Sequence, residues 1–212
     1  MPIERIGIIG AGKLGVTLAQ LALEAGYEVY IAGSGNPEKI RLSTQIVTPG
    51  ATALATKEVV EKADIVVLAL PLGQFRMLDP TLFSGKLVLD AMNHWFEVDG
   101  PLEDIIIDDK PTTTEVQRHF IDARVVKAFN HMGYHHLRDE AKTRGANDRK
   151  AIAFATDSQT DVDTVAQFID SIGFDPLYIG RLSASRPLES GGSAFGANVT
   201  SDMLKQLVGG TR

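Results

Sequence analysis

The most constraining feature of this sequence is a glycine motif near its N-terminus, Gly10-Ala11-Gly12-Lys13-Leu14-Gly15, with the spacing G-x-G-x-x-G. Residues 6–9 before it form an apolar run that predicts a buried strand, and residues 13–25 predict a helix ended by Gly26. In this context the first glycine permits a tight turn, the second lets the backbone approach a pyrophosphate, and the third lets the helix pack closely on the strand. The motif therefore predicts a dinucleotide site with the phosphates at the helix N-terminus; a glycine-rich turn without a ligand is the alternative.

Strand and helix patterns continue along the chain. Further strands are predicted at residues 28–32, 64–70, 86–90, 124–129, 151–156 and 176–179, and further helices at 56–62, 114–120 and 161–172. Apolar strands that alternate with helices are typical of a parallel sheet with helices on both faces. We therefore predict an α/β, Rossmann-like doubly wound fold with a mostly parallel sheet over residues 1–180. Residues 181–212 form a C-terminal extension too short to fold alone, and we expect it to pack on the main body or on a partner subunit.

The composition excludes several classes of function. The 212-residue chain has no cysteine, which excludes thiol nucleophiles, iron–sulfur clusters and thiolate zinc sites. It carries 21 basic and 27 acidic residues, a formal charge of −6, and no basic stripe, so we expect no nucleic-acid partner. No apolar run reaches the roughly 18 residues of a membrane span, and no signal peptide is recognisable. We therefore expect a cytoplasmic protein without a membrane partner.

The end of the second predicted strand bears on the choice of dinucleotide. NAD sites usually place an acid there to bind the ribose hydroxyls, but residues 32–36 read Ala-Gly-Ser-Gly-Asn and contain none. Ser34, the N–H groups of Gly35 and Asn36, and the nearby Lys39 and Arg41 could instead receive a 2′-phosphate. This pattern favours NADP, although a polar turn before a helix would have the same residues.

Two competing classes of nicotinamide enzyme lack their signatures here. Short-chain dehydrogenases need Tyr-x-x-x-Lys, and none of the four tyrosines has a lysine four residues later. Hydroxyacid dehydrogenases and imine reductases append a large all-helical substrate domain, for which the residues after Arg181 are too few. We therefore expect the substrate to bind to the nucleotide domain itself.

These motifs, together with Val-Val-Lys-Ala-Phe-Asn at residues 125–130 and Gly-Phe-Asp-Pro at 173–176, resemble the NADP-linked coenzyme F420 oxidoreductase family. The resemblance covers nearly the whole chain, because residues 63–71, 90–93 and 180–189 also follow the family's order. Similar segments occur in the cytosolic nucleotide domain of the six-transmembrane metalloreductases, which passes electrons from NADPH to a flavin. The resemblance implies hydride transfer between NADPH and a flat tricyclic acceptor, which is coenzyme F420 or a flavin such as FMN or FAD.

The motif and the resemblance together imply a set of cofactor-binding residues. Ala11 to Leu14 would contact the pyrophosphate, Ser34 and Lys39 the 2′-phosphate, and the segment around Pro71 the nicotinamide ribose. Gly35 stands where the family usually has arginine, which lowers the expected NADP selectivity. Restoring that arginine should raise the selectivity, provided that the backbone does not require a positive φ. The full set is Gly10, Ala11, Gly12, Lys13, Leu14, Ser34, Gly35, Asn36, Lys39, Leu70, Pro71, Gln74, Asn93 and Ala128.

The sequence gives weaker evidence for the residues that bind the acceptor. Hydride transfer between two rings needs close parallel faces more than an acid or a base, so we predict no catalytic proton-transfer residue. Candidate substrate-binding residues are Asn130, His131 and His94, with Met132, Tyr134, His135 and His136 or Trp95 and Phe96 as further pocket walls. Alternatively, the histidines after Asn130 belong to a solvated polar loop, Asn130 caps a helix, and Trp95 and Phe96 close the core. A metal held by His131 and His135 is a further alternative, although we predict no metal site.

Two other classes of function remain open at this point. The chain could bind NADP as a redox-sensing regulator without turnover, or it could be a structural interaction protein that has lost the acceptor site. A homodimer is compatible with either of these and with the reductase. Oxidation of NADPH by a ring acceptor separates the reductase from both.

Overall fold

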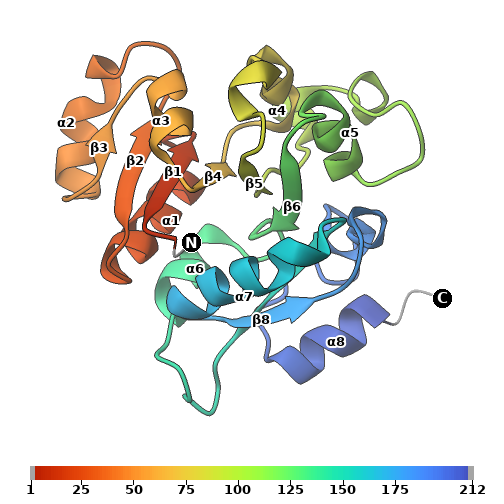
Figure 1. Cartoon of the computed structure of the whole chain (residues 1–212). Coiled ribbons are helices and arrows are strands. Elements are labelled where there is room, and N and C mark those ends of the chain that lie inside the picture. Colours follow the sequence, from red (N-terminus) through yellow and green to blue (C-terminus); the bar gives the residue numbers. More distant parts are fainter. Residues whose placement is uncertain (1–2, 210–212) are drawn as a thin grey trace.

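The computed structural model describes residues 3–209, which are built around one eight-stranded sheet (Figure 1). The strand order is β3-β2-β1-β4-β5-β6-β7-β8, and every neighbouring pair is parallel except β6 and β7. The strands are β1 (Arg5–Ile9), β2 (Glu28–Ala32), β3 (Thr52–Ala53), β4 (Ile65–Leu68), β5 (Leu87–Asp90), β6 (Arg124–Ala128), β7 (Ala151–Thr156) and β8 (Asp175–Tyr178). The helices are α1 (Lys13–Glu24), α2 (Glu38–Val47), α3 (Thr56–Lys62), α4 (Phe96–Asp99), α5 (Thr112–His119), α6 (Tyr134–Glu140), α7 (Val162–Ser171) and α8 (Ser201–Gly209). The predicted α/β, doubly wound and mostly parallel fold is confirmed.

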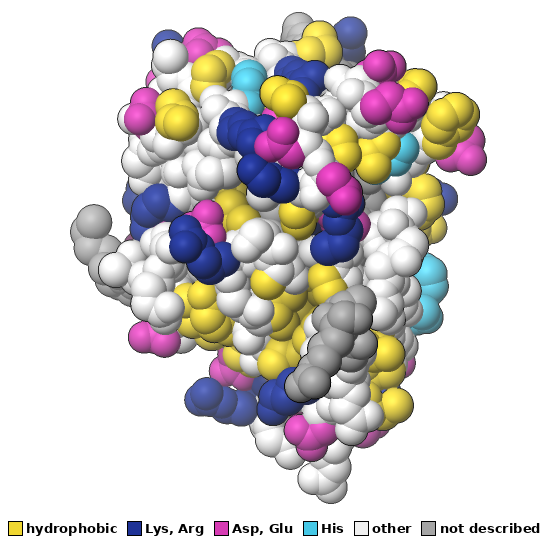
Figure 2. Space-filling model, turned by 90° about the vertical axis from the view of Figure 1, so that its right-hand side faces the viewer, with side chains coloured by type: hydrophobic (Ala, Val, Ile, Leu, Met, Phe, Trp, Pro, Cys, Tyr) yellow, Lys and Arg dark blue, Asp and Glu magenta, His cyan; other side chains and the backbone are white. Residues whose placement is uncertain are grey.

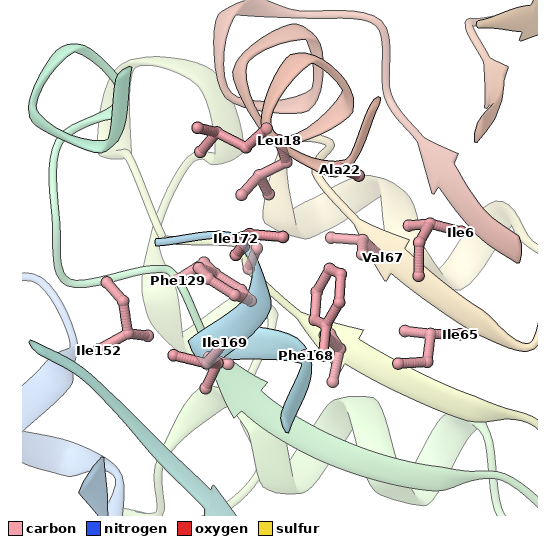
Figure 3. Packing of buried hydrophobic residues seen from close by; sticks show 14 of the residues in the cluster. Ile6, Leu18, Ala22, Ile65, Val67, Phe129, Ile152, Phe168, Ile169 and Ile172 are labelled. Atoms are coloured by element: carbon pink, nitrogen blue, oxygen red, sulfur yellow. The ribbon is translucent and has the colours of Figure 1, made fainter. Parts of the chain in front are cut away.

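Both faces of the sheet are buried, because its central strands are apolar on both sides. On one face, Ile6 lies in a cluster with Leu18 of α1 and Phe168 of α7 (Figure 3). On the other, Ile9 lies in a second cluster with Val59 of α3. Each fully buried Ile or Phe in such a cluster contributes about 1.5–3 kcal/mol, so the two clusters hold the helices on their faces of the sheet.

The chain reverses direction after β6, which apolar pattern alone does not reveal. Val126 of β6 lies opposite Thr156, and Ala128 lies opposite Phe154, so β7 runs antiparallel to β6. The carboxyl ends of β1, β2, β4, β5 and β6 therefore lie at one edge of the sheet, together with the amino end of β7. In an open α/β sheet this edge holds the ligand crevice.

Several elements lie outside the predicted pattern. The predicted strand at 64–70 ends at Leu68, and helices α2, α4, α6 and α8 were not predicted. In α2, Leu42 and Ile46 are exposed, so the apolar residues of this helix do not follow the buried face. Burial-based reasoning therefore could not find it.

The C-terminal extension packs on the main body. Leu204 of α8 and Leu188 are fully buried in a third cluster with Ala151 and Ala153 of β7 and Leu177 of β8. The backbone N–H of Ala151 also donates to the carbonyl of Val199 (3.0 Å), which ties the extension to the first residue of β7. The division of the chain at residue 180 stays a prediction.

The last two features of the fold are the distribution of charge on its surface and the lengths of its helices. On the face that carries α5 and α8, Lys and Arg side chains are interleaved with Asp and Glu (Figure 2). None of the helices within residues 3–209 has the length and apolar character needed to cross a membrane.

Candidate functional site

The three motif glycines have three different geometries. Gly10 has φ +119°, and a Cβ there would lie 2.2 Å from the carbonyl oxygen of Ala69; at Gly15 a Cβ would lie 1.9 Å from the carbonyl oxygen of Gly10. The turn and the close packing of α1 on the sheet therefore require the first and third glycines. A Cβ at Gly12 would meet nothing within 4 Å, so this position faces open space.

The N-terminus of α1 is free of competing negative charge. Gly12 is its N-cap residue and makes no side-chain cap, and the first turn contains no acidic residue. The N–H groups of a first helical turn have no acceptor within the helix, and the helix dipole adds partial positive charge there. This end of α1 is thus suited to bind an anion such as a pyrophosphate.

A cleft of about 520 Å³ lies over this glycine turn, at the carboxyl ends of β1, β2 and β4. The strand order reverses between β1 and β4, so the cleft occupies the topological switch point of the sheet. We call it the glycine cleft. Its lining consists of Ile9, Gly10, Ala11, Gly12, Gly33, Ser34, Gly35, Ile40, Thr56, Ala69, Leu70, Pro71, Gln74, Met77 and Leu78.

A second hollow, of about 350 Å³, lies at the carboxyl ends of β5 and β6 and is rich in aromatic side chains. We call it the aromatic pocket. It is lined by Leu14, Asn93, Trp95, Phe129, Asn130, His131, Met132, Gly133, Tyr134, His135, Phe195 and Gly196. None of these described lining residues is Asp, Glu, Lys or Arg, so the pocket is suited to an uncharged ring.

The glycine cleft and the aromatic pocket are separated by the first turn of α1. Gly12 lines the cleft and Leu14, two residues later, lines the pocket. A ligand whose phosphates bind at this helix N-terminus can therefore extend into both hollows.

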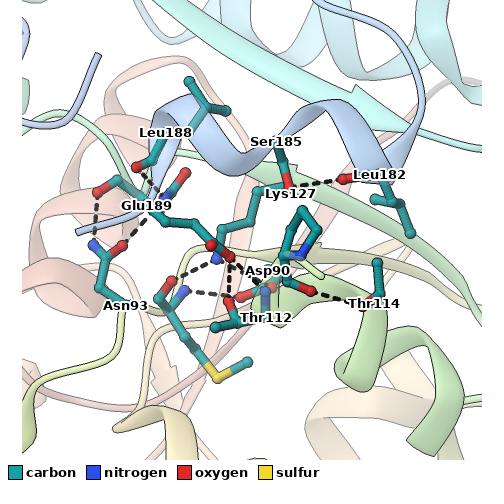
Figure 4. A network of polar contacts seen from close by, with 12 residues as sticks. Asp90, Asn93, Thr112, Thr114, Lys127, Leu182, Ser185, Leu188 and Glu189 are labelled. Atoms are coloured by element: carbon teal, nitrogen blue, oxygen red, sulfur yellow. Dashed lines mark hydrogen bonds and ion pairs between the residues drawn. The ribbon is translucent and has the colours of Figure 1, made fainter. Parts of the chain in front are cut away.

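Two amides form one wall of the aromatic pocket. The Nδ2 of Asn93 donates to the backbone carbonyl of Asn130 (2.6 Å), and the Nδ2 of Asn130 donates to the Oδ1 of Asn93 (3.1 Å) and to the carbonyl of Leu188 (2.7 Å). These bonds join the ends of β5 and β6 to the C-terminal extension (Figure 4). Asn130 therefore does not cap a helix, and its Oδ1 is buried with no hydrogen-bond partner.

A buried ion pair supports this wall from below. Lys127 of β6 and Asp90 of β5 are both fully buried, with 3.2 Å between Nζ and Oδ2 (Figure 4). The Nζ also donates to the carbonyl of Met92 (2.6 Å), and the Oδ1 of Asp90 accepts from the Met92 N–H (3.0 Å). The pair thus fixes the segment that presents Asn93.

The chain turns sharply where β6 enters the pocket. Phe129 has φ +65° and is the one non-glycine residue within 3–209 with a positive φ. Such a conformation is costly for a bulky residue and persists only where packing holds it. Here the buried Phe129 ring packs edge-on against Phe168 at 6.0 Å, which fixes the backbone turn that leads into Asn130.

Comparison with known proteins gives one family match. The family described as NADP oxidoreductase, coenzyme F420-dependent, matches residues 5–94, which contain β1 to β5 and the glycine turn. The resemblance to this oxidoreductase family is confirmed. The matched segment is similar to that of NADP-linked oxidoreductases. No curated protein matches the chain.

Solved structures similar to this chain share its fold. A hypothetical protein of Sinorhizobium meliloti is 26% identical with a TM-score of 0.81, and the match covers 94% of this chain and 97% of that one. A presumed F420-dependent NADP reductase of Arthrobacter sp. FB24 is 23% identical with a TM-score of 0.69, over 85% and 86% of the two chains. An imine reductase of Bacillus cereus is 16% identical with a TM-score of 0.61, over 85% of this chain and 56% of that one. The chain therefore spans little more than half of the imine reductase.

Most of the cofactor residues expected for such an oxidoreductase line one of the two hollows. Eight of them line the glycine cleft, namely Gly10, Ala11, Gly12, Ser34, Gly35, Leu70, Pro71 and Gln74. Leu14 and Asn93 line the aromatic pocket, as do the acceptor candidates Asn130 and His131. Their ligand contacts remain predictions.

Other expected residues lie elsewhere. The Oδ1 of Asn36 accepts from the Glu38 N–H (2.9 Å) at the start of α2, so this side chain starts a helix and does not line the cleft. Ala128 is fully buried within β6, and the Nε2 of His94 lies 2.8 Å from the carbonyl of Gly100. Neither Ala128 nor His94 lines one of the two hollows, and their contact with the ring or the acceptor stays a prediction.

Two lysines lie at the borders of the site. Lys13 and Lys39 are exposed and line neither hollow. The Nζ of Lys13 lies 5.4 Å from the centre of the Tyr134 ring, at the mouth of the aromatic pocket. Lys39 makes no ion pair with any residue within 3–209, whereas Arg41 pairs with Glu38 at 3.0 Å. Lys39 is therefore the more available cation beside Ser34.

His131 is a structural residue of the pocket wall. It is 1% exposed, its Nε2 accepts from the Ala153 N–H of β7 (3.1 Å), and burial lowers its pKa to about 4. The imidazole is thus neutral at physiological pH and supports the wall from behind. Because α6 begins only at Tyr134, His131 and His135 do not share a helix, and no group of three or more acidic or histidine side chains within 3–209 is placed to hold a metal ion.

Phe195 of the C-terminal extension is one of the pocket residues that sequence reasoning missed; the others are Phe129, Gly133 and Gly196. Its ring centre lies 5.9 Å from that of Trp95, at an interplanar angle of 60°. The one available signal was an aromatic residue in a segment otherwise rich in Gly, Ser and Ala. That signal says nothing about which part of the fold the ring contacts.

Proposed function

We propose that the protein transfers a hydride between NADPH and a flat tricyclic acceptor, either the deazaflavin of coenzyme F420 or a flavin. The observation that carries this proposal is the placement of the two hollows on either side of the α1 N-terminus, with Gly12 in one and Leu14 in the other. A dinucleotide with its pyrophosphate at that turn has room for its adenosine end in the glycine cleft. Its nicotinamide end then lies toward the uncharged aromatic pocket.

The chain's own residues have binding and positioning roles in this proposal. The first turn of α1 binds the pyrophosphate, and the open side of Gly12 lets it approach closely. Ser34 follows β2 and lines the glycine cleft, and Lys39 is an exposed lysine five residues later. We expect these two residues to bind the 2′-phosphate, which supports NADP over NAD. Asn93 and Asn130, locked together at the ends of β5 and β6, form a rigid wall of the aromatic pocket.

The chemistry of the site agrees with ring-to-ring transfer. The hydride leaves the reduced nicotinamide with its two electrons, the acceptor ring gains them, and solvent supplies the balancing proton. The pocket has to hold the two faces about 3–3.5 Å apart and exclude water, for which aromatic and aliphatic walls suffice. His131 takes no part in proton transfer, because its imidazole is buried and bonded to β7.

The test is anaerobic oxidation of NADPH with several acceptors in parallel: F420, FMN, FAD, a quinone and a cyclic imine. We expect reduction of F420 or a flavin, with a primary kinetic isotope effect when the NADPH is deuterated at the reacting carbon. Reduction of the imine alone would replace the proposed acceptor class. Tight NADPH binding without any turnover would favour a redox sensor, and no binding at all would favour a structural role.

A further inference from the structure

Trp95 and Phe195 come from segments 100 residues apart in sequence, yet both line the aromatic pocket, with their ring centres 5.9 Å apart. Trp95 is half-exposed and is the N-cap residue of α4. Its backbone N–H donates to the Oδ2 of Asp99 (2.9 Å), whose Oδ1 accepts from the Gly73 N–H (2.9 Å). The Trp95 backbone is therefore fixed while its indole remains open to a ligand.

The Phe195 backbone is held in place by the residues on both sides of it. Ala194 is fully buried, and the N–H of Gly196 donates to the backbone carbonyl of His131 (2.7 Å). His131 is itself tied to β7 through Ala153. The turn that carries Phe195 is thus anchored to the core, and the ring is a preformed wall.

The charge around this wall argues for the class of ligand. The described residues that line the aromatic pocket include no charged side chain, and the lysine at its mouth, Lys13, lies over the Tyr134 ring next to the phosphate-binding end of α1. A phosphate or carboxylate inside the pocket would have no cation to pair with, whereas an uncharged aromatic ring would stack on Trp95 and Phe195. This lining therefore favours a ligand that is recognised by its aromatic ring and not by a phosphate.

We propose that Trp95 and Phe195 determine acceptor specificity by binding the uncharged tricyclic ring, and that any phosphate of the acceptor stays outside the pocket. This inference rests on the proposed function for its acceptor class. It predicts that riboflavin, which has the ring without a phosphate, binds as tightly as FMN, which has both.

Trp95 is the only tryptophan in the sequence, so its fluorescence reports directly on the pocket. Riboflavin, FMN and ribose 5-phosphate are titrated with and without NADP⁺, which cannot donate a hydride, and free N-acetyltryptophanamide corrects for absorbed light. We expect equal quenching affinities for riboflavin and FMN, and no quenching by ribose 5-phosphate. Much tighter binding of FMN than of riboflavin, or no quenching by either flavin, would overturn the proposal.

Three variants assign the effect to Phe195. Phe195→Ala should weaken ring binding about tenfold, since an aromatic contact contributes up to about 1.5 kcal/mol beyond its buried area. Phe195→Tyr should restore it. Phe96→Ala is the matched control, because Phe96 is exposed beside Trp95 but does not line the pocket. Unchanged ring affinity in a folded Phe195→Ala variant would contradict the proposal.

This test fails separately from the proposed function. Ring binding is measured without turnover, so quenching that depends on Phe195 would stand even if NADPH were never oxidised. Conversely, NADPH oxidation by a flavin whose binding ignores Phe195 would support the reductase and reject this specificity role.

Discussion

At the scale of single residues, His131 couples the stability of the fold to pH. Its folded-state pKa is lowered to about 4 by burial, against 6.5 for an ordinary histidine. Above the unfolded value both states are neutral and the stabilisation is complete; as the pH falls, the unfolded state gains a proton first and stability is lost until about pH 4. The difference between the two pKa values corresponds to about 3 kcal/mol of unfolding free energy. Urea midpoints measured from about pH 7 to about pH 4.5 should therefore fall more steeply for the parent than for His131→Gln. Identical slopes would contradict this assignment.

Also at this scale, the buried pair of Lys127 and Asp90 should be costly to break. Lys127→Met leaves the Asp90 carboxylate buried without its cation, which should lower the free energy of unfolding by about 3–5 kcal/mol. The control is Lys57→Met, whose partner Glu61 lies 3.8 Å away on the surface and should matter by no more than about 0.5 kcal/mol. Denaturant unfolding of both variants measures the two losses of unfolding free energy. If both losses are equally small, the ion pair of Lys127 and Asp90 does not stabilise the fold.

At the scale of elements, the turn between β2 and α2 should set the preference for NADPH over NADH. One charge-assisted contact to the 2′-phosphate is worth about 1.5–3 kcal/mol, so we expect roughly a ten- to hundredfold preference that Lys39→Ala largely removes. Lys57→Ala, an exposed lysine on α3, is the control. Calorimetric titration of both nucleotides measures the ratio, and equal affinities in the parent would reject the NADP assignment.

The arginine that the family resemblance implies at position 35 cannot simply be introduced. Gly35 has φ +84°, a conformation that costs about 1–2 kcal/mol for a residue with a side chain, although a Cβ there would meet no atom within 4 Å. The condition under which Gly35→Arg would raise NADP selectivity is therefore not met, and we expect that variant to lose stability.

The elements also show what the sequence could and could not reveal. The glycine turn and the buried strands β1, β2 and β4 to β7 were predictable, because apolar β-branched runs and the G-x-G-x-x-G spacing are local signals. The reversal of β7 was not, since a strand's direction leaves no trace in its own residues. The pairing of Asn93 with Asn130 and of Trp95 with Phe195 depends on contacts distant in sequence, which a single chain's pattern does not encode.

At the scale of the whole molecule, the C-terminal extension should unfold with the main body. Leu204→Ala removes a fully buried side chain from the cluster on β7 and β8 and should cost about 2–5 kcal/mol in one cooperative transition. The neighbouring Met203→Ala, at a half-exposed position, is the control and should cost far less. If the midpoint of the main unfolding transition is the same in Leu204→Ala as in the parent, the extension is an independent appendage.

Direct titration of NADPH tests most sharply whether the glycine turn binds its pyrophosphate. Gly12→Val places a side chain on the open side of the turn, while Gly209→Val adds the same side chain at another position where a Cβ meets nothing within 4 Å. We expect Gly12→Val, folded by circular dichroism, to bind NADPH about a hundredfold more weakly, because charge-assisted phosphate contacts are worth about 1.5–3 kcal/mol each. Gly209→Val should bind NADPH as the parent does. If a folded Gly12→Val variant binds NADPH with the parent's affinity, the glycine turn does not bind the pyrophosphate.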